Sequence, residues 1–140
     1  MDRIAMAGHL IRRLHQQSTQ VFQAQTQAAG FDLTSVQFAA LDAVAGQPGI
    51  DQASLAATIG FDRATIGGVI DRLEQKGLLQ REVSVLDRRA RSLQLTPAGE
   101  RLLAAVRPVV EGLQADILAP LTRKEREAFL ALALKALGIP

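Results

Sequence analysis

Apolar residues recur every three or four positions along most of the chain, the spacing that places them on one face of a helix. This pattern predicts a long first helix over about residues 2–29, which ends at Gly30. A second helix is expected from Thr34 to about Gly46, because Thr34 and Gln37 have the spacing of a capping box.

Two short helices in tandem are expected after the turn "GQPG" at residues 46–49. Asp51 is the expected N-cap of the first helix, which Gly60 closes. Asp62 is the expected N-cap of the second, which Gly77 closes. Since only a few residues separate these helices, the pattern indicates a helix-turn-helix.

The period changes to alternation after Gly77, where residues 78–85 and 91–95 are strand-like on either side of "LDRRA". These two segments predict a β-hairpin. The chain is therefore expected to be mainly α with a small β-hairpin, in the order α-α-α-α-β-β-α-α.

Two further helices follow the hairpin. Thr96 and Pro97 open the first, which is expected to run to about Leu118 with a bend near Pro108. The second starts at a capping box formed by Thr122 and Glu125, and Gly138 stops it.

Composition excludes several classes of function. The chain has 140 residues, enough for one domain with its own core, and it has no cysteine, which excludes disulfides and thiolate metal sites. The two histidines, His9 and His15, are six positions apart rather than the four that share a helical face, so no metal site is expected. We find no nucleophile–base pairing, phosphate loop or cofactor motif, so an enzyme is not expected.

No apolar run is long enough to span a membrane and no signal peptide is visible, so we expect a cytoplasmic protein.

The helix expected after Asp62 has an unusual outer face. Its apolar residues fall on one side and are expected in the core: Ile66, Val69, Ile70 and Leu73. The other side is small at its start and polar beyond, and it comprises Ala64, Thr65, Gly67, Gly68, Asp71, Arg72 and Gln75. A helix that enters the major groove of DNA needs little bulk there. Close helix–helix packing is the alternative role for the two glycines.

Basic residues cluster at the expected hairpin tip. The net charge is only +2, so the distribution of charge matters more than its sum. Arg88, Arg89 and Arg91 fall within four positions and suit contacts to phosphates or to the minor groove, while Asp87 is expected to orient an arginine. A solvated turn is the simpler alternative.

The stretches "VIDRLEQKGLLQRE" and "DRRARSLQLTPAGE", placed after a helix-turn-helix, resemble the MarR family of winged helix-turn-helix transcriptional regulators. The resemblance covers the whole chain. It implies a homodimer in which residues 1–30 and 98–140 form the dimerisation region, and residues 31–97 form a winged DNA-binding lobe. It also implies that two lobes read successive major grooves of double-stranded DNA, on a pseudo-palindromic operator.

The DNA-contacting positions of the family fall on the helix and the hairpin tip of this chain. With the outer-face residues noted above, the expected DNA-binding set is Asp62, Arg63, Ala64, Thr65, Gly67, Gly68, Arg72, Asp87, Arg88, Arg89 and Arg91. Ala64, Gly67 and Gly68 depart from the Ser, Thr or longer polar residues that members commonly carry there. Specificity is therefore expected to depend on Arg63, Thr65, Arg72, the hairpin tip and DNA shape.

The resemblance also implies release from DNA when a small ligand binds. Through "GHLIRRLHQQ" the chain is most similar to regulators of aromatic-acid catabolism, in which a basic residue of the first helix pairs with a ligand carboxylate. Here the expected ligand-binding residues are His9, Arg12, Arg13, His15 and Ser18. The effector is expected to be a small aromatic acid or phenol. Because the chain lacks Trp and Tyr, its ring would pack on aliphatic residues or Phe.

Two functions are carried forward. The first is a ligand-responsive DNA-binding regulator, expected to be a repressor. The second is a winged-helix module for protein association, in which the basic tip meets an acidic partner and no small ligand is involved.

Overall fold

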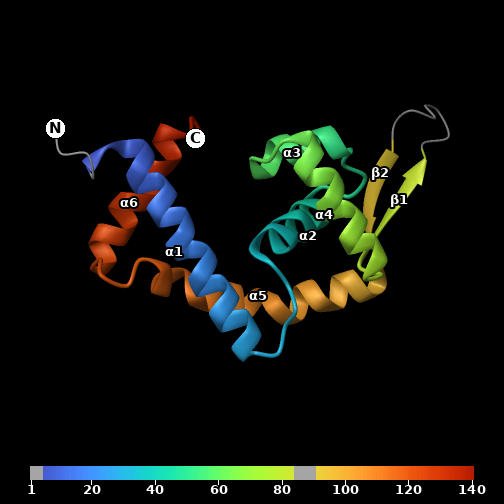
Figure 1. Ribbon diagram of the computed structural model, residues 1–140, viewed down its shortest axis with the longest axis horizontal. Coiled ribbons are helices and arrows are strands. Elements are labelled where there is room, and N and C mark those ends of the chain that lie inside the picture. Colours follow the sequence, from blue (N-terminus) through green and yellow to red (C-terminus); the bar gives the residue numbers. More distant parts are fainter. Residues whose placement is uncertain (1–4, 84–90) are drawn as a thin grey trace.

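The computed structural model describes residues 5–83 and 91–140, with the side chain of Arg91 excepted. These residues form helices and two strands in the expected order (Figure 1). The elements are α1 Ala7–Ala28, α2 Ser35–Gly46, α3 Gln52–Ile59, α4 Arg63–Gln75, β1 Leu79–Val83, β2 Arg91–Leu95, α5 Pro97–Ile117 and α6 Arg123–Ala136. The mainly α fold with a β-hairpin wing is confirmed.

Local capping sets most helix boundaries as the sequence predicts. Thr34 and Gln37 form a complete capping box at the start of α2, and Thr122 and Glu125 form another at the start of α6. Gly60 and Gly77 both adopt positive φ just after α3 and α4, a backbone conformation that side-chain-bearing residues rarely adopt. Helix α5 starts at Pro97 and continues through Pro108.

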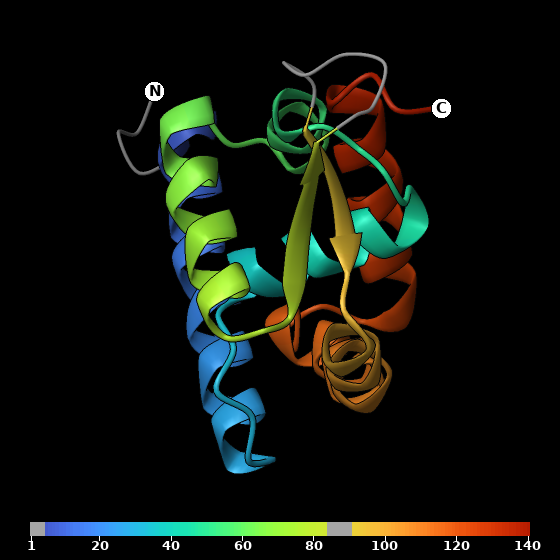
Figure 2. The ribbon, with the colours of Figure 1, turned by 90° about the vertical axis from the view of Figure 1, so that its right-hand side faces the viewer.

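The hairpin pairs β1 with β2 antiparallel, with Leu79 opposite Leu95 and Val83 opposite Arg91. The segment just before α3 adds to its free edge. The Gly49 N–H donates to the Leu93 carbonyl, the Leu93 N–H donates to the Ile50 carbonyl, and Asp51 forms a bridge with Ser92. The sequence predicted only a turn here. Figure 2 shows the two strands side by side, with α5 seen nearly end-on below them.

Helices α2, α3 and α4 pack with strands β1 and β2 into what we call the winged lobe, which comprises residues 33–83 and 91–95 of the described chain. Its core consists of buried aliphatic side chains, among them Leu41, Leu55, Ile66, Ile70, Leu73 and Leu93, each completely or almost completely buried. Burial of this apolar surface is the main stabilising contribution to the lobe. Helix α5 continues the core with Leu103 and Val106.

Helices α1 and α6, with the C-terminal half of α5, form the other half of the molecule, which we call the helical arm (left half of Figure 1). Helix α1 packs mainly on α5. Its glutamine-rich half contributes directly, since Gln17 Nε2 donates to the Ile117 carbonyl at 2.7 Å and Gln25 Nε2 donates to Asp116 at 2.8 Å. Helix α6 has no buried residue.

Gly99 marks the junction of the lobe with α5. Thr96 caps α5 by accepting the Gly99 N–H, and its own hydroxyl donates to the Gly77 carbonyl at 2.6 Å. A Cβ at Gly99 would lie 2.0 Å from the Leu78 carbonyl oxygen, a distance that no packing tolerates. Gly99, the glycine of "LTPAG", is therefore required by the close approach of α5 to the backbone of Leu78, which immediately precedes β1.

Candidate nucleic-acid interface

Helix α4 presents its small outer face to solvent. Ile66, Val69, Ile70 and Leu73 are buried as predicted. The residues predicted to contact DNA from the start of this helix are exposed, namely Asp62, Arg63, Ala64, Thr65 and Gly68. The outer face of α4 is therefore available to a partner in the single chain.

Asp62 forms the N-cap of α4. Its carboxylate accepts the Thr65 N–H at 2.7 Å and the Thr65 hydroxyl at 3.0 Å. These hydrogen bonds, that of the backbone N–H first, lower the pKa of Asp62 below its usual range. Asp51 makes the same contacts with Ser54 at the start of α3, with the same effect on its pKa. Asp62 and Thr65 thus engage each other, and the Asp62 carboxylate orders the first turn of α4.

The two adjacent glycines have different surroundings. A Cβ at Gly68 would meet nothing within 4 Å, whereas a Cβ at Gly67 would lie 3.2 Å from the side-chain amide nitrogen of Gln52 on α3. Gly67 is also half-buried. Of the two roles that the sequence left open, Gly67 fits close packing of α3 on α4, and Gly68 fits an open outer surface.

Arg72 lies farther along the same face. It is exposed and lines a shallow groove between α4 and the first turn of α2. The groove also holds Thr34, Val36, Gln37, Thr65, Gly68 and Val69. Because Gly68 has no side chain, the groove stays open onto the outer face of α4.

The hairpin is fixed to α4 by an arginine that sequence reasoning left without a role. Arg81 on β1 pairs with Asp71 at 2.7 Å and with Glu74 at 2.8 Å. The Arg81 side chain is only 19% exposed, so these pairs are partly shielded from water. The single positive charge of Arg81 offsets part of the negative charge of two α4 carboxylates, including Asp71 on the outer face, and the two ion pairs hold β1 against the helix.

The predicted hairpin-tip contacts Asp87, Arg88 and Arg89 lie outside the described residues, as does the side chain of Arg91. The backbone of Arg91 begins β2. The contribution of the tip to binding therefore stays a prediction from the sequence.

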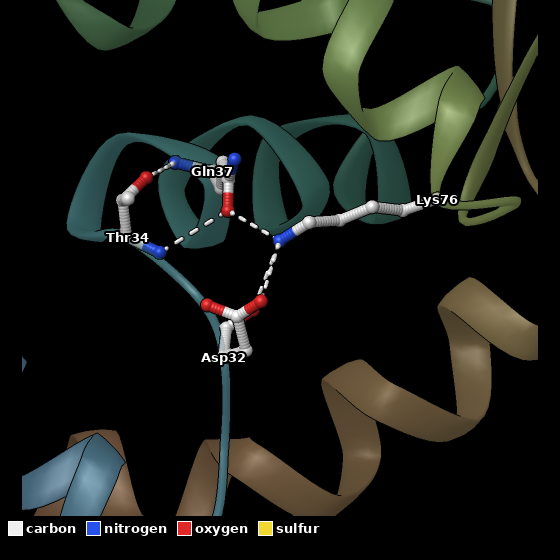
Figure 3. A network of polar contacts seen from close by, with 4 residues as sticks. All are labelled: Asp32, Thr34, Gln37 and Lys76. Carbon is white, nitrogen blue, oxygen red and sulfur yellow. Dashed lines mark hydrogen bonds and ion pairs between the residues drawn. The ribbon is translucent and has the colours of Figure 1, made fainter.

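A second contact missed by sequence reasoning holds the end of α4 (Figure 3). Lys76, the C-cap residue of α4, donates from Nζ to the Asp32 backbone carbonyl at 3.0 Å and to Gln37 Oε1 at 3.4 Å. The Asp32 carboxylate lies 3.7 Å away and is fully exposed. These partners are 39 and 44 positions apart in sequence, too far for local pattern analysis to pair them.

The predicted ligand-binding residues lie along α1, and the structure divides them between two hollows. His9, Arg12, Arg13 and His15 line the first, together with Gln16, Thr19 and Gln20. Among the residues that the structure describes, only α1 contributes to this lining, so they form a single wall. His15 also lines the second hollow, where it is joined by Ser18.

The second hollow lies between α1, α5 and α6. Leu14, Ile117, Phe129 and Leu130 contribute to it, together with two cations of α6 that sequence reasoning missed, Arg123 and Arg126. Arg123 pairs with Glu127 at 3.4 Å, and Arg126 donates to the Leu121 carbonyl at 2.9 Å. Both arginines already have partners within α6 and the turn before it.

Comparison with known proteins agrees with the winged helix-turn-helix fold described above. The MarR family model matches residues 31–90. The transcriptional regulator HosA of Escherichia coli is 35% identical over 132 residues, which cover 94% of this chain and 95% of the relative. The HTH-type transcriptional repressor NicR of Pseudomonas putida is 35% identical over 134 residues, which cover 96% of this chain and 84% of the relative.

The fold also matches that of BpsR from Bordetella bronchiseptica, whose structure describes the regulation of DNA binding by 6-hydroxynicotinic acid. The TM-score is 0.89 at 29% identity, and the match covers 100% of this chain and 99% of that chain. The expected similarity to aromatic-acid regulators is consistent with this neighbour. Within residues 5–83 and 91–140, no helix has the length and apolar composition needed to cross a membrane. With the winged lobe, the exposed face of α4 and relatives of this similarity over nearly its whole length, the chain belongs to the MarR family of transcriptional regulators and is not an enzyme.

Proposed function

We propose that the protein is a homodimeric transcriptional repressor that a small aromatic carboxylic acid or phenol releases from a pseudo-palindromic operator. Residues 31–97 would bind DNA, and residues 1–30 and 98–140 would form the dimer. The observation that carries the proposal is the outer face of α4, which is exposed, nearly free of bulk at its start and bordered by Arg63 and Arg72. The repressor role is supported by the likeness to NicR.

The contact set for DNA is the one expected from the sequence, with roles refined by the geometry. Arg63, Thr65 and Arg72 would contact DNA from α4, and Ala64 and Gly68 would allow its close approach. Asp62 would act through the cap, and Gly67 through packing on Gln52. Arg88, Arg89 and Arg91 would contact phosphates or the minor groove from the hairpin tip, with Asp87 orienting one of them.

The dimer is supported by apolar surface that one chain leaves uncovered. Almost all of the large exposed hydrophobic residues belong to the start of α1 or to α6 and the residues after it, namely Met6, Leu10, Ile11, Leu130, Leu132, Leu134, Leu137 and Ile139. An apolar surface of this kind marks an interaction site. Regulators of this family act as dimers, so a second copy is the proposed occupant.

The ligand site is proposed on α1, where the Arg12 or Arg13 guanidinium would pair with the carboxylate. His9, His15 and Ser18 would contribute polar contacts. Because α1 is the one element of the described chain that lines the first hollow, a second copy would supply the opposite wall. Aromatic acids are favoured by the likeness to BpsR.

Release would follow if the bound ligand favours a separation of the two lobes that fails to match successive grooves, about 34 Å apart in DNA. The ligand would thus shift the population of dimers from one lobe spacing to the other. The size of this shift is limited by the ratio of the ligand's affinities for the two spacings.

The test starts from duplex DNA selected by the protein from a random pool. Gel shifts should show a selected palindrome bound with steep salt dependence, since phosphate contacts dominate affinity. Hydroxylated benzoic and nicotinic acids, including 6-hydroxynicotinic acid, should raise the melting temperature and release the DNA. Arg12→Gln with Arg13→Gln should abolish the ligand response while keeping DNA binding. Failure to select any sequence at low salt would refute the regulator, and a response that survives in the double variant would refute the α1 ligand site.

The same assay distinguishes the protein-association module. If Arg88→Ala with Arg89→Ala leaves DNA affinity unchanged, the basic tip serves another partner. The proposed repressor requires affinity to fall and the salt slope to flatten.

A further inference from the structure

We infer that Lys76 is a positioning residue for operator binding, which fixes the angle between α4 and the connection that joins α1 to α2. The inference rests on the proposed function for its consequence in DNA binding, but the contact itself lies within one chain. Neither the DNA-contacting set nor the ligand-binding set above includes Lys76 or its partners.

Lys76 lies where α4 ends, and its backbone is already fixed. The Gly77 N–H donates to the Glu74 carbonyl and the Leu78 N–H donates to the Leu73 carbonyl, which closes the helix with Gly77 at positive φ. The Lys76 side chain is therefore not needed to terminate α4. It extends away from the helix end to a different part of the chain (Figure 3).

The partners of Lys76 belong to the connection between the helical arm and the winged lobe. Asp32 supplies its backbone carbonyl at 3.0 Å, and Gln37 supplies its side-chain oxygen at 3.4 Å. That Gln37 oxygen also accepts the Thr34 N–H at 3.2 Å, so one buried amide links the cap of α2 to the end of α4. The carbonyl and the amide are fixed by the fold, whereas the fully exposed Asp32 carboxylate contributes little.

From this position the Lys76 contact can affect DNA binding, because it restricts the orientation of α4 relative to the arm. Residues 29–34 connect α1 of the arm to α2 of the lobe. A hydrogen bond from the end of α4 to this connection limits rotation of α4 relative to α1. In a dimer built on the arm, the two α4 helices can occupy both half-sites only if that orientation is held. Linking two binding sites increases the overall affinity only when the geometry allows both to bind at the same time.

The first test measures the orientation within one chain. The protein has no cysteine, so Gln27→Cys on α1 and Ala64→Cys on α4, both exposed, can be spin-labelled without background, and excess unlabelled protein suppresses signals between copies. Pulsed dipolar spectroscopy should show a broader label-to-label distance distribution in Lys76→Met than in the parent. Lys76→Arg, which keeps a cationic donor, should restore the narrow distribution. Asp32→Asn, which keeps the backbone carbonyl, should leave it narrow.

An unchanged distribution in Lys76→Met overturns the inference, as does equal broadening in Asp32→Asn. Because this distance depends neither on dimerisation nor on DNA, its result stands even if the proposed function fails. Failure of the proposed function would be seen separately, as a parent protein that is monomeric or selects no DNA.

The second test separates positioning from a direct phosphate contact. On the selected palindrome, Lys76→Met should lose about tenfold in affinity, while a duplex with one half-site scrambled should lose less than about twofold, since only the full site needs both lobes aligned. A phosphate contact would instead weaken both duplexes equally and reduce the salt slope by about 1. Equal losses on the two duplexes therefore overturn the positioning role.

Discussion

The winged lobe and the helical arm differ in how much of their apolar surface one chain covers. In the lobe, α2, α3, α4 and the hairpin enclose side chains such as Leu41 and Ile66 completely. In the arm, α6 has no buried residue, and Leu130 and Leu137 are 56% and 73% exposed. The lobe therefore has a buried core of its own, whereas the arm leaves large apolar side chains exposed, as expected if a second copy covers them. The proposed DNA-contacting face of α4 is therefore formed within one chain, whereas the proposed ligand and dimer surfaces would each need a second copy.

The largest expected effect comes from making the arm unable to accept a second copy. Leu130 and Leu137 are seven positions apart on one face of α6 and its end, so Leu130→Asp with Leu137→Asp should prevent dimer formation. Light scattering after size exclusion should show a monomer, and affinity for the selected palindrome should fall by about 100-fold. Val83→Asp places one such charge on a residue of the lobe that is as exposed as Leu130, and it should leave a dimer. A double variant that remains dimeric would contradict the proposed interface.

The junction between the two regions is tested by two glycines of α5. Gly99→Ala forces a Cβ against the Leu78 carbonyl and should reduce the free energy of unfolding by roughly 1–3 kcal/mol or more. Gly112→Ala, in the arm half of the same helix, meets nothing within 4 Å and should raise stability by about 0.5–1 kcal/mol. Urea denaturation measures both. Equal changes in the free energy of unfolding at the two positions would mean that α5 does not closely approach the Leu78 carbonyl.

The outer and inner glycines of α4 provide a finer test within the lobe. Gly68→Ala should stabilise the free protein by about 0.5–1 kcal/mol through helix propensity. It should weaken operator binding by about fivefold or more, since an extra methyl in a packed interface costs roughly 1–3 kcal/mol.

Gly67→Ala is the matched control. Its Cβ would need only a small shift of the flexible Gln52 side chain, so stability should change less and DNA affinity should stay near that of the parent. Gel shifts and thermal melts would measure the pair. Stronger operator binding by Gly68→Ala would show that its open face does not approach DNA.

The smallest effect is a pH dependence at the start of α4. Hydrogen bonds from Thr65 lower the pKa of Asp62 in the folded protein, so the ionised carboxylate contributes stability above its ordinary value of 3.8. That contribution is lost as the pH falls through the lowered pKa. Asp62→Asn keeps a capping acceptor but cannot titrate, so its stability should fall less steeply than that of the parent below about pH 4. Urea titrations between pH 7 and pH 3 would measure it, and parallel curves would contradict the role of the carboxylate.

Features that depend on neighbours in sequence were predictable. The caps at Thr34, Asp62 and Thr122 join residues three positions apart, and the buried face of α4 follows from helical periodicity. The order of elements and the family followed from such local patterns. These features depend on the backbone and side-chain preferences of residues three or four positions apart, which can be read from the sequence.

Contacts between distant segments were decided only by the packing of helices. Nothing near Gly67 or Gly68 in sequence says that Gln52 lies against one and open space against the other. The Lys76 contact with Asp32 and the edge bridge of Asp51 with Ser92 likewise join segments about 40 positions apart.

The sequence by itself determined the order of the elements, most of their capped ends, the buried face of α4 and the family of this protein, because short-range hydrogen bonding and hydrophobic periodicity specify them. The tertiary structure alone decided which glycine faces outward, where Arg81 and Lys76 are engaged, and that the arm leaves its leucines uncovered. These depend on the orientation in which packed helices meet, and helical periodicity tells which face is apolar but not what covers it.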